Sequence, residues 1–239
     1  MKHTLWITLA LAAAFTPLAL RADDEARKWH FDMSLYGMAA GMSGDVTVKG
    51  IKTDLDVPFS TVLDNLEFGA FGRVRAGNGR WAVATDVIYA GLGASKGPVS
   101  GDVDQWLISP TLEYEVCKYF DAFAGARYNN ISAEIRGPFG RVRSGTVDWW
   151  EPVVGGRVKV PLYKSLSFEV MGDIGGLGVE GTGLSWQVEP VLSWRFSKHA
   201  SLQAGYRWIQ SDFEQGSGAN KFRYDVLMQG PQIGLTMHF

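Results

Sequence analysis

Residues 184–196 read LSWQVEPVLSWRF, with apolar side chains at every second position from Trp186 onward. The positions between them are mostly polar or charged, as at Gln187, Glu189 and Arg195. A period of two is typical of a β-strand, because successive side chains of a strand point to opposite faces of its sheet. We therefore predict a strand here with one apolar face and one polar face.

The same alternation recurs along the chain and predicts ten strands. Each is long enough to cross a bilayer when tilted, which takes about 9 to 11 residues. The predicted strands are residues 29–39, 66–76, 81–92, 105–116, 120–133, 149–160, 166–175, 184–196, 202–211 and 222–239.

The connections between these strands alternate in length. The short ones carry the Gly, Asn, Pro or Ser that tight turns favour and are residues 77–80, 117–119, 161–165 and 197–200. The long ones are polar or glycine-rich and are residues 40–65, 93–104, 134–148, 176–183 and 212–221. Such alternation is typical of outer-membrane barrels, which have short periplasmic turns and longer external loops.

One face of the predicted strands has no charged residue, although 20% of the chain is charged. The opposite face carries both acids and bases. A soluble β-sandwich could show the same period with its apolar face inside, so periodicity alone leaves two fold classes open. Aromatic residues separate them, because they gather at both ends of the strands as the two girdles of a membrane barrel do. The first girdle is Trp29, Trp81, Phe120, Trp194, Phe196 and Phe239, and the second is Tyr89, Trp106, Tyr128, Trp150, Trp186 and Trp208.

We therefore expect an all-β fold, a ten-stranded antiparallel transmembrane β-barrel, with eight or twelve strands as alternatives. Twelve would result if residues 46–51 and 54–57 formed an extra hairpin in the first long connection. Residues 1–22 have the layout of a secretory signal peptide, with Lys2 before a short apolar run. The barrel domain would then span residues 23–239 and lie in the outer membrane of a Gram-negative cell.

Composition and motif spacing exclude several functions. A net charge of −2 gives no basic excess for binding nucleic acid, and one cysteine excludes an internal disulfide framework. Residues 176–181 match GxGxxG, but a strand pattern follows where a dinucleotide site needs a helix. The aspartates of the first long connection lack EF-hand spacing. We expect no cofactor and no metal site.

Charges on the inward face can pair across a lumen that ten strands leave narrow. Pairing matters because an unpaired buried charge is costly. We predict a largely occluding network formed by Glu67, Arg73, Asp86, Arg127, Glu151, Arg157 and Asp173.

The first long connection holds a candidate plug. Ser60 could cap a short helix on which Phe59, Val62 and Leu63 share one side. Two interpretations stay open: a helix folded into the lumen, or a surface loop with its own small apolar cluster.

The last ten residues end in Phe239, with Ile233, Leu235 and Met237 at alternate positions before it. This ending resembles the C-terminal signal read by the barrel-assembly machinery. Residues 79–81, 124–128, 151–155 and 173–178 are similar to stretches of a family of mostly uncharacterised proteobacterial outer-membrane β-barrels in the porin-like superfamily. The resemblance covers most of the chain after the signal peptide. It implies the fold and the location, and it implies little about activity.

For function we expect a non-enzymatic envelope protein, either structural or a narrow gated pore for small solutes. The alternatives are a barrel enzyme acting on lipid A or peptides at the external rim, and a surface adhesin. No catalytic residue is predicted, because His30, His199 and His238 all map to the periplasmic end. The expected partners are outer-membrane lipid, lipopolysaccharide and the barrel-assembly machinery, with no nucleic acid, and the protein is expected to be a monomer.

Overall fold

The computed structural model describes residues 29–96, 99–136 and 142–239, so the expected signal peptide at residues 1–22 lies outside it. The strands are β1 (Trp29–Met38), β2 (Gly41–Val48), β3 (Ile51–Val57), β4 (Leu66–Asn78), β5 (Trp81–Lys96), β6 (Val99–Cys117), β7 (Phe120–Arg136), β8 (Val142–Tyr163), β9 (Leu166–Gly176), β10 (Leu184–Arg195), β11 (Ala200–Gln215) and β12 (Phe222–His238). The helices are α1 (Phe59–Asp64) and the short 3₁₀ turns η3 (Val179–Gly181) and η4 (Gly218–Asn220).

Ten of the strands close into an antiparallel barrel, which confirms the predicted fold and strand number. β1 pairs with β4 on one side and with β12 on the other, so the first and last strands complete the circle. The remaining two strands form a hairpin, in which β2 extends the sheet from β12 and β3 lies outside β2. An extra pair of strands therefore forms in the first long connection, but the predicted bounds of residues 46–51 and 54–57 are wrong, because the turn lies at Lys49 and Gly50 and residues 52–53 belong to β3. The hairpin does not enter the ring.

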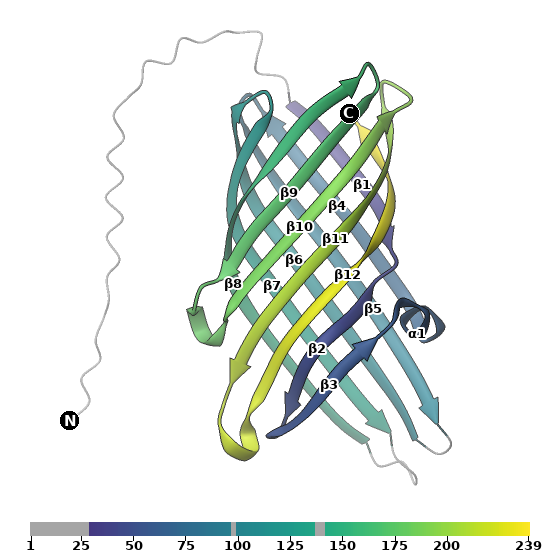
Figure 1. Cartoon of the computed structure of the whole chain (residues 1–239), viewed down its shortest axis with the longest axis vertical. Helices are drawn as coiled ribbons and strands as arrows, with labels where there is room; N and C mark the ends of the chain where they lie inside the picture. The colour runs from purple at the N-terminus through teal and green to yellow at the C-terminus, as the bar shows by residue number, and fades with distance from the viewer. Residues whose placement is uncertain (1–28, 97–98, 137–141) are drawn as a thin grey trace, which may run out of the picture.

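The two ends of the barrel differ (Figure 1). The described chain starts and finishes at one end, at the top of the figure, together with the short turns between β4 and β5, β6 and β7, β8 and β9, and β10 and β11. We call this the short-turn end. The long hairpins and the β2–β3 pair project from the opposite, long-hairpin end.

Several connections predicted as loops are strand instead. β5 continues to Lys96 and pairs with β6 from Val99, and β11 continues to Gln215 opposite Phe222. Beyond a membrane both faces of a sheet meet water, so backbone pairing can continue without alternating hydrophobicity. The hydrophobic period therefore marks the part of each strand within the membrane rather than its full length.

The outward face is apolar, as predicted. Large hydrophobic side chains such as Leu35, Val74, Val83, Val154 and Leu192 are exposed there, while the charged positions of the same strands turn inward. An apolar band of this kind around a closed barrel is the surface that lipid covers. The barrel therefore spans a membrane.

Both aromatic girdles are present. At the short-turn end Trp81 packs against Tyr114 with tilted rings whose centroids are 4.8 Å apart, and Trp194 lies beside Phe196. Towards the long-hairpin end neighbouring strands contribute the pairs Tyr89–Trp106 and Tyr128–Trp150, and β11 alone contributes Tyr206–Trp208, with centroids 4.3 to 4.9 Å apart. Aromatic rings at two levels match the two interfaces of a bilayer.

The predicted short helix forms, but it begins earlier than expected. α1 starts at Phe59, and its first turn is bonded through the Pro58 carbonyl, which accepts from the amides of Thr61 and Val62. Ser60 therefore lies inside the helix and is not its N-cap. Among the described residues, no helix has the length and hydropathy to cross a membrane.

Candidate functional site in the barrel lumen

A cavity of about 430 Å³ opens into the lumen near the short-turn end. We call it the vestibule. Polar side chains from most of the surrounding strands line it, among them Asp32, Tyr36, Arg73, Glu189, Gln203 and His238. Its volume is within the range of small-molecule sites in proteins.

The first ionic cluster lies at the inner limit of the vestibule and centres on Arg207, which is fully buried. Its guanidinium donates to Asp86 at 2.9 Å, to the Tyr36 hydroxyl at 2.7 Å and to Gln187 at 2.8 Å. The Tyr36 hydroxyl in turn donates to Asp86 at 2.9 Å. Arg73 reaches the same carboxylate at 3.2 Å, so two cations hold one acid.

A second cluster lies across the lumen on β7, β8 and β9. Arg127 donates to Asp173 at 2.6 Å and to Glu151 at 3.3 Å, and Glu151 has no exposed surface. Each ion of this cluster is therefore removed from water and paired. Breaking such a buried pair by removing one partner typically costs about 3 to 5 kcal/mol.

A third cluster lies nearer the short-turn end. Glu113 accepts from Arg75 at 2.6 Å and from Arg157 at 2.9 Å. Asp121 accepts from Lys159 at 2.9 Å, and Arg157 lies 3.9 Å from it. Bases and acids thus alternate around this part of the barrel wall.

A second cavity of about 20 Å³ separates the three clusters. Arg73 and Arg157 line both this cavity and the vestibule, so these two side chains stand between them. A space of this size holds about one water molecule. The ionic clusters therefore leave only a small gap at this level of the lumen.

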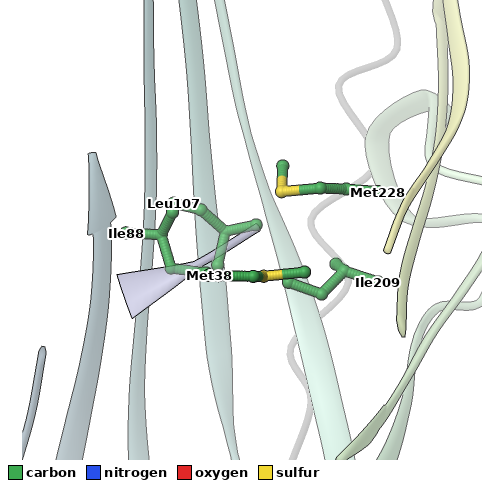
Figure 2. Packing of buried hydrophobic residues seen from close by; sticks show 5 residues of the cluster. All are labelled: Met38, Ile88, Leu107, Ile209 and Met228. Carbon is green, nitrogen blue, oxygen red and sulfur yellow. The ribbon is translucent and has the colours of Figure 1, made fainter. Parts of the chain in front are cut away.

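Towards the long-hairpin end the lumen is filled by apolar side chains. Met38, Ile88, Leu107, Ile209 and Met228 converge from five strands into one buried cluster (Figure 2). Beyond it, Trp149 stacks flat on Phe213 at 4.5 Å and packs with Tyr224 and Val226. The buried members of both clusters come from the barrel strands, and Met42, Val46 and Leu55 of the β2–β3 hairpin pack against them.

The structure brings six of the seven predicted network residues into these ionic clusters. Arg127, Glu151 and Asp173 form one, Arg73 and Asp86 belong to another, and Arg157 belongs to the third. The side chain of Glu67 lies outside the described part of the structure. Sequence reasoning left three further residues out of the network: Arg207, Glu113 and Glu189, whose carboxylate lies 3.3 Å from Arg73. All three stand at the inward-facing alternate positions of their strands, as the predicted members do.

None of the candidate plug residues whose side chains are described, Phe59, Ser60 and Val62, belongs to the apolar lumen clusters. α1 packs against β2, and Phe59 is 37% exposed. Val62 is half-buried, and the Leu63 side chain lies outside the described part. Inside the barrel, the space is occupied by side chains from the strands.

A further polar constellation connects three strands at the short-turn end. The imidazole of His238 lies with Nδ1 2.7 Å from the Asp32 carboxylate and Nε2 2.8 Å from Ser201 Oγ. Asp32 and His238 stand opposite each other where β1 meets β12, and Ser201 stands opposite Thr236, two residues before His238. Sequence reasoning missed this group because only closure of the barrel brings residues 32 and 238 together.

Three other sequence predictions concern a metal site, the GxGxxG match and the assembly signal. In the part of the chain that is described, no group of three or more His, Cys, Asp or Glu side chains is placed to hold a metal ion. The GxGxxG match forms the loop from β9 to β10 and is followed by a strand. The assembly-signal residues Ile233, Leu235 and Phe239 are exposed on the outer face, and Met237 is partly buried.

Comparison with known proteins finds structural likeness only. No family model matches the sequence, and no curated protein matches it either. The resemblance to one family of proteobacterial barrels therefore stays an expectation.

Among solved structures, the chain is similar to the outer membrane protease OmpT of Escherichia coli, with a TM-score of 0.47 and 8% identity over 88% of this chain and 96% of that one. It is similar to Ail, the attachment invasion locus protein of Yersinia pestis, with a TM-score of 0.42 and 12% identity over 88% and 98%. A FadL homologue of Pseudomonas aeruginosa gives a TM-score of 0.40 and 7% identity over 89% and 90%.

Proposed function

We propose that this membrane-spanning barrel resides in the Gram-negative outer membrane, with its short-turn end in the periplasm, and that its lumen is closed to solutes at rest. The observation that carries the proposal is the sequence of layers inside the barrel. Buried ion pairs around Arg207 and Arg127 come first, and the apolar cluster around Ile209 lies beyond them. A solute would have to disrupt both layers to cross.

The role that fits a closed lumen is that of an envelope protein acting as a structural barrel. We propose no enzymatic role for the long-hairpin end, because all three histidines of the described residues lie at the short-turn end. Lipid, lipopolysaccharide and the barrel-assembly machinery remain the proposed partners, the last through the C-terminal residues of β12. A monomer is proposed as well.

A narrow gated pore is the second candidate, and one observation favours it. Arg73 and Arg157 line both cavities, so movement of these two long side chains would join the vestibule to the inner space. The ion pairs of Arg207 and Arg127 and the two apolar clusters would then remain as barriers. In this second candidate the arginines are part of the gate.

Planar-bilayer recording tests the proposal. The wild-type protein should show no steady conductance, because both layers block the lumen. Replacing Met38 and Ile209 by Ala, together with Arg207→Ser and Asp86→Ser, removes bulk from both layers and should produce open-channel current. Val83→Ala, on the lipid-facing side, is the control and should stay silent. A steady large wild-type conductance would contradict closure, and brief voltage-dependent openings would favour the gated pore.

A further inference from the structure

We propose that Ser201, His238 and Asp32 form a hydrolytic triad that opens to the vestibule and cleaves slender carboxylic esters from the periplasmic side. The proposal does not depend on whether the lumen is closed, because the vestibule opens at the short-turn end in either case.

The donors and acceptors of these hydrogen bonds are arranged as ester hydrolysis by a triad requires. Since His238 Nδ1 faces the Asp32 carboxylate at 2.7 Å, that nitrogen carries the ring proton and donates it. In the neutral imidazole Nε2 is then the acceptor for the Ser201 hydroxyl, whose Oγ lies 2.8 Å away. A nucleophile bonded to a base that is itself oriented by a third group defines a triad by geometry, whatever the chain order.

The surroundings of Ser201 give it a site. Across the sheet Ser201 stands opposite Thr236 on β12 and Arg195 on β10. Both residues line the vestibule, and so does His238. Gln203, which is the next inward-facing residue after Ser201 on β11, lines it too. Ser201 itself is not one of the lining residues, so the nucleophile lies in the vestibule wall next to Thr236 and His238, which do line it.

Two features define the substrate class. Ser201 is 2% exposed, so only a slender acyl group can bring its carbonyl carbon to Oγ. Gln203 carries an amide donor on the same face, which can stabilise an oxyanion as side-chain amides do in other hydrolases. We infer small or unbranched acyl esters rather than bulky ones.

The reaction balances with water as the co-substrate. Ser201 Oγ attacks the ester carbonyl carbon while its proton moves to His238 Nε2, and the oxyanion accepts a hydrogen bond from Gln203. The carbon–oxygen bond to the alcohol then breaks, and the Nε2 proton passes to the leaving oxygen. Water attacks the acyl-Ser201 carbonyl, gives one proton to Nε2, and releases a carboxylic acid as the proton returns to Oγ. Asp32 stays ionised throughout and acts as a positioning residue.

The experiment uses the purified full-length barrel in detergent micelles, with p-nitrophenyl acetate as substrate and an alkyl fluorophosphonate as covalent probe. Mass spectrometry of the wild type should locate the probe on Ser201. This measurement needs no variant and is therefore independent of folding defects. Hydrolysis by Ser201→Ala or His238→Gln should fall at least about 100-fold. Asp32→Asn should lower kcat while KM stays unchanged, because Asp32 acts through His238.

Ser193→Ala is the matched control, since Ser193 is a buried, inward-facing serine on the neighbouring strand β10. It should hydrolyse and label like the wild type. Probe found elsewhere or not at all, or hydrolysis by Ser201→Ala equal to that of the wild type, would overturn the proposal. The three side chains would then serve only to fasten β1, β11 and β12 together.

Discussion

Buried charge is the feature of this molecule that single residues control most strongly. Arg207 holds Asp86, Tyr36 and Gln187 at once, from a position with no exposed surface. Charges so far from water are tolerated because each has a partner, and an orphaned partner is costly. The contribution of such a residue is therefore best measured by removing it alone and then together with its partner.

Replacing Arg207 by Ala should lower the free energy of unfolding by up to about 3 to 5 kcal/mol, because Asp86 loses its closest cation and keeps only Arg73. Arg207→Met with Asp86→Leu should recover much of this loss, since no charge is then left unpaired. Urea unfolding in lipid vesicles, followed by tryptophan fluorescence, measures both. Arg195→Ala is the control and should change stability by less than about 0.5 kcal/mol, because Arg195 is exposed. A single and a double variant of equal stability would argue against the buried pair.

Asp212 gives a prediction about pH, since it lies beyond the girdle residue Trp208 and so outside the membrane. Burial, with the nearby Asp225 carboxylate, raises the pKa of Asp212, and Arg223 partly opposes this. A raised pKa means that the folded hairpin holds the proton more tightly than the unfolded chain. This residue therefore favours folding at low pH, and the effect is lost as pH rises through the folded-state pKa.

Asp212→Asn should remove this pH dependence and should protect the β11–β12 hairpin better than the wild type at neutral pH. Hydrogen exchange of the hairpin amides at pH 5 and pH 7, corrected for intrinsic exchange rates, measures the effect. Amides of β9, far from the hairpin tip, serve as the internal reference. Equal protection of the two proteins at both pH values would show that the Asp212 carboxyl has no such role.

At the scale of elements, alternation predicted ten strands within a few residues over their membrane-crossing parts. It failed at the long-hairpin end, where β5, β6, β7 and β8 extend past the apolar band and no hydrophobic period marks them. The β2–β3 hairpin was predicted as an alternative, but with its turn at residues 52–53. In the structure the turn is at Lys49 and Gly50, whose positive φ values of 53° and 78° suit a two-residue turn. Its attachment to β12 is a long-range pairing that no local pattern reveals.

Removing residues 59–65 and joining β3 to β4 with a Gly-Ser linker should leave bilayer conductance as low as in the wild type. The lumen is filled by side chains of the barrel strands, and α1 packs on β2. Planar-bilayer current from the deletion variant makes this measurement. Native folding is checked by heat-modifiable migration on gels. Open-channel current from a folded deletion variant would restore the plug hypothesis.

For the whole molecule, one arrangement of side chains determines both the fold and the site. When the ring closes, the uncharged alternate side chains of each strand point outward. The charged side chains between them gather within a narrow lumen. The alternation of side chains along each strand was therefore enough to predict which residues meet in the lumen. Which acid pairs with which base depends on the register of strands far apart in sequence, and so does the meeting of Asp32, His238 and Ser201. These pairings follow from closure and could not be predicted locally.

The central claim is that lipid contacts every second side chain of each membrane-crossing strand and that the side chains between them point into the lumen. Site-directed spin labelling along β8, one cysteine at a time from Trp149 to Val160 in a Cys117→Ser background, tests it most directly. Accessibility of each label to membrane-dissolved oxygen should alternate with a period of two, high at even-numbered positions such as Val154 and low at odd-numbered ones such as Val153. High oxygen accessibility at the odd-numbered positions, or no alternation at all, would contradict the account.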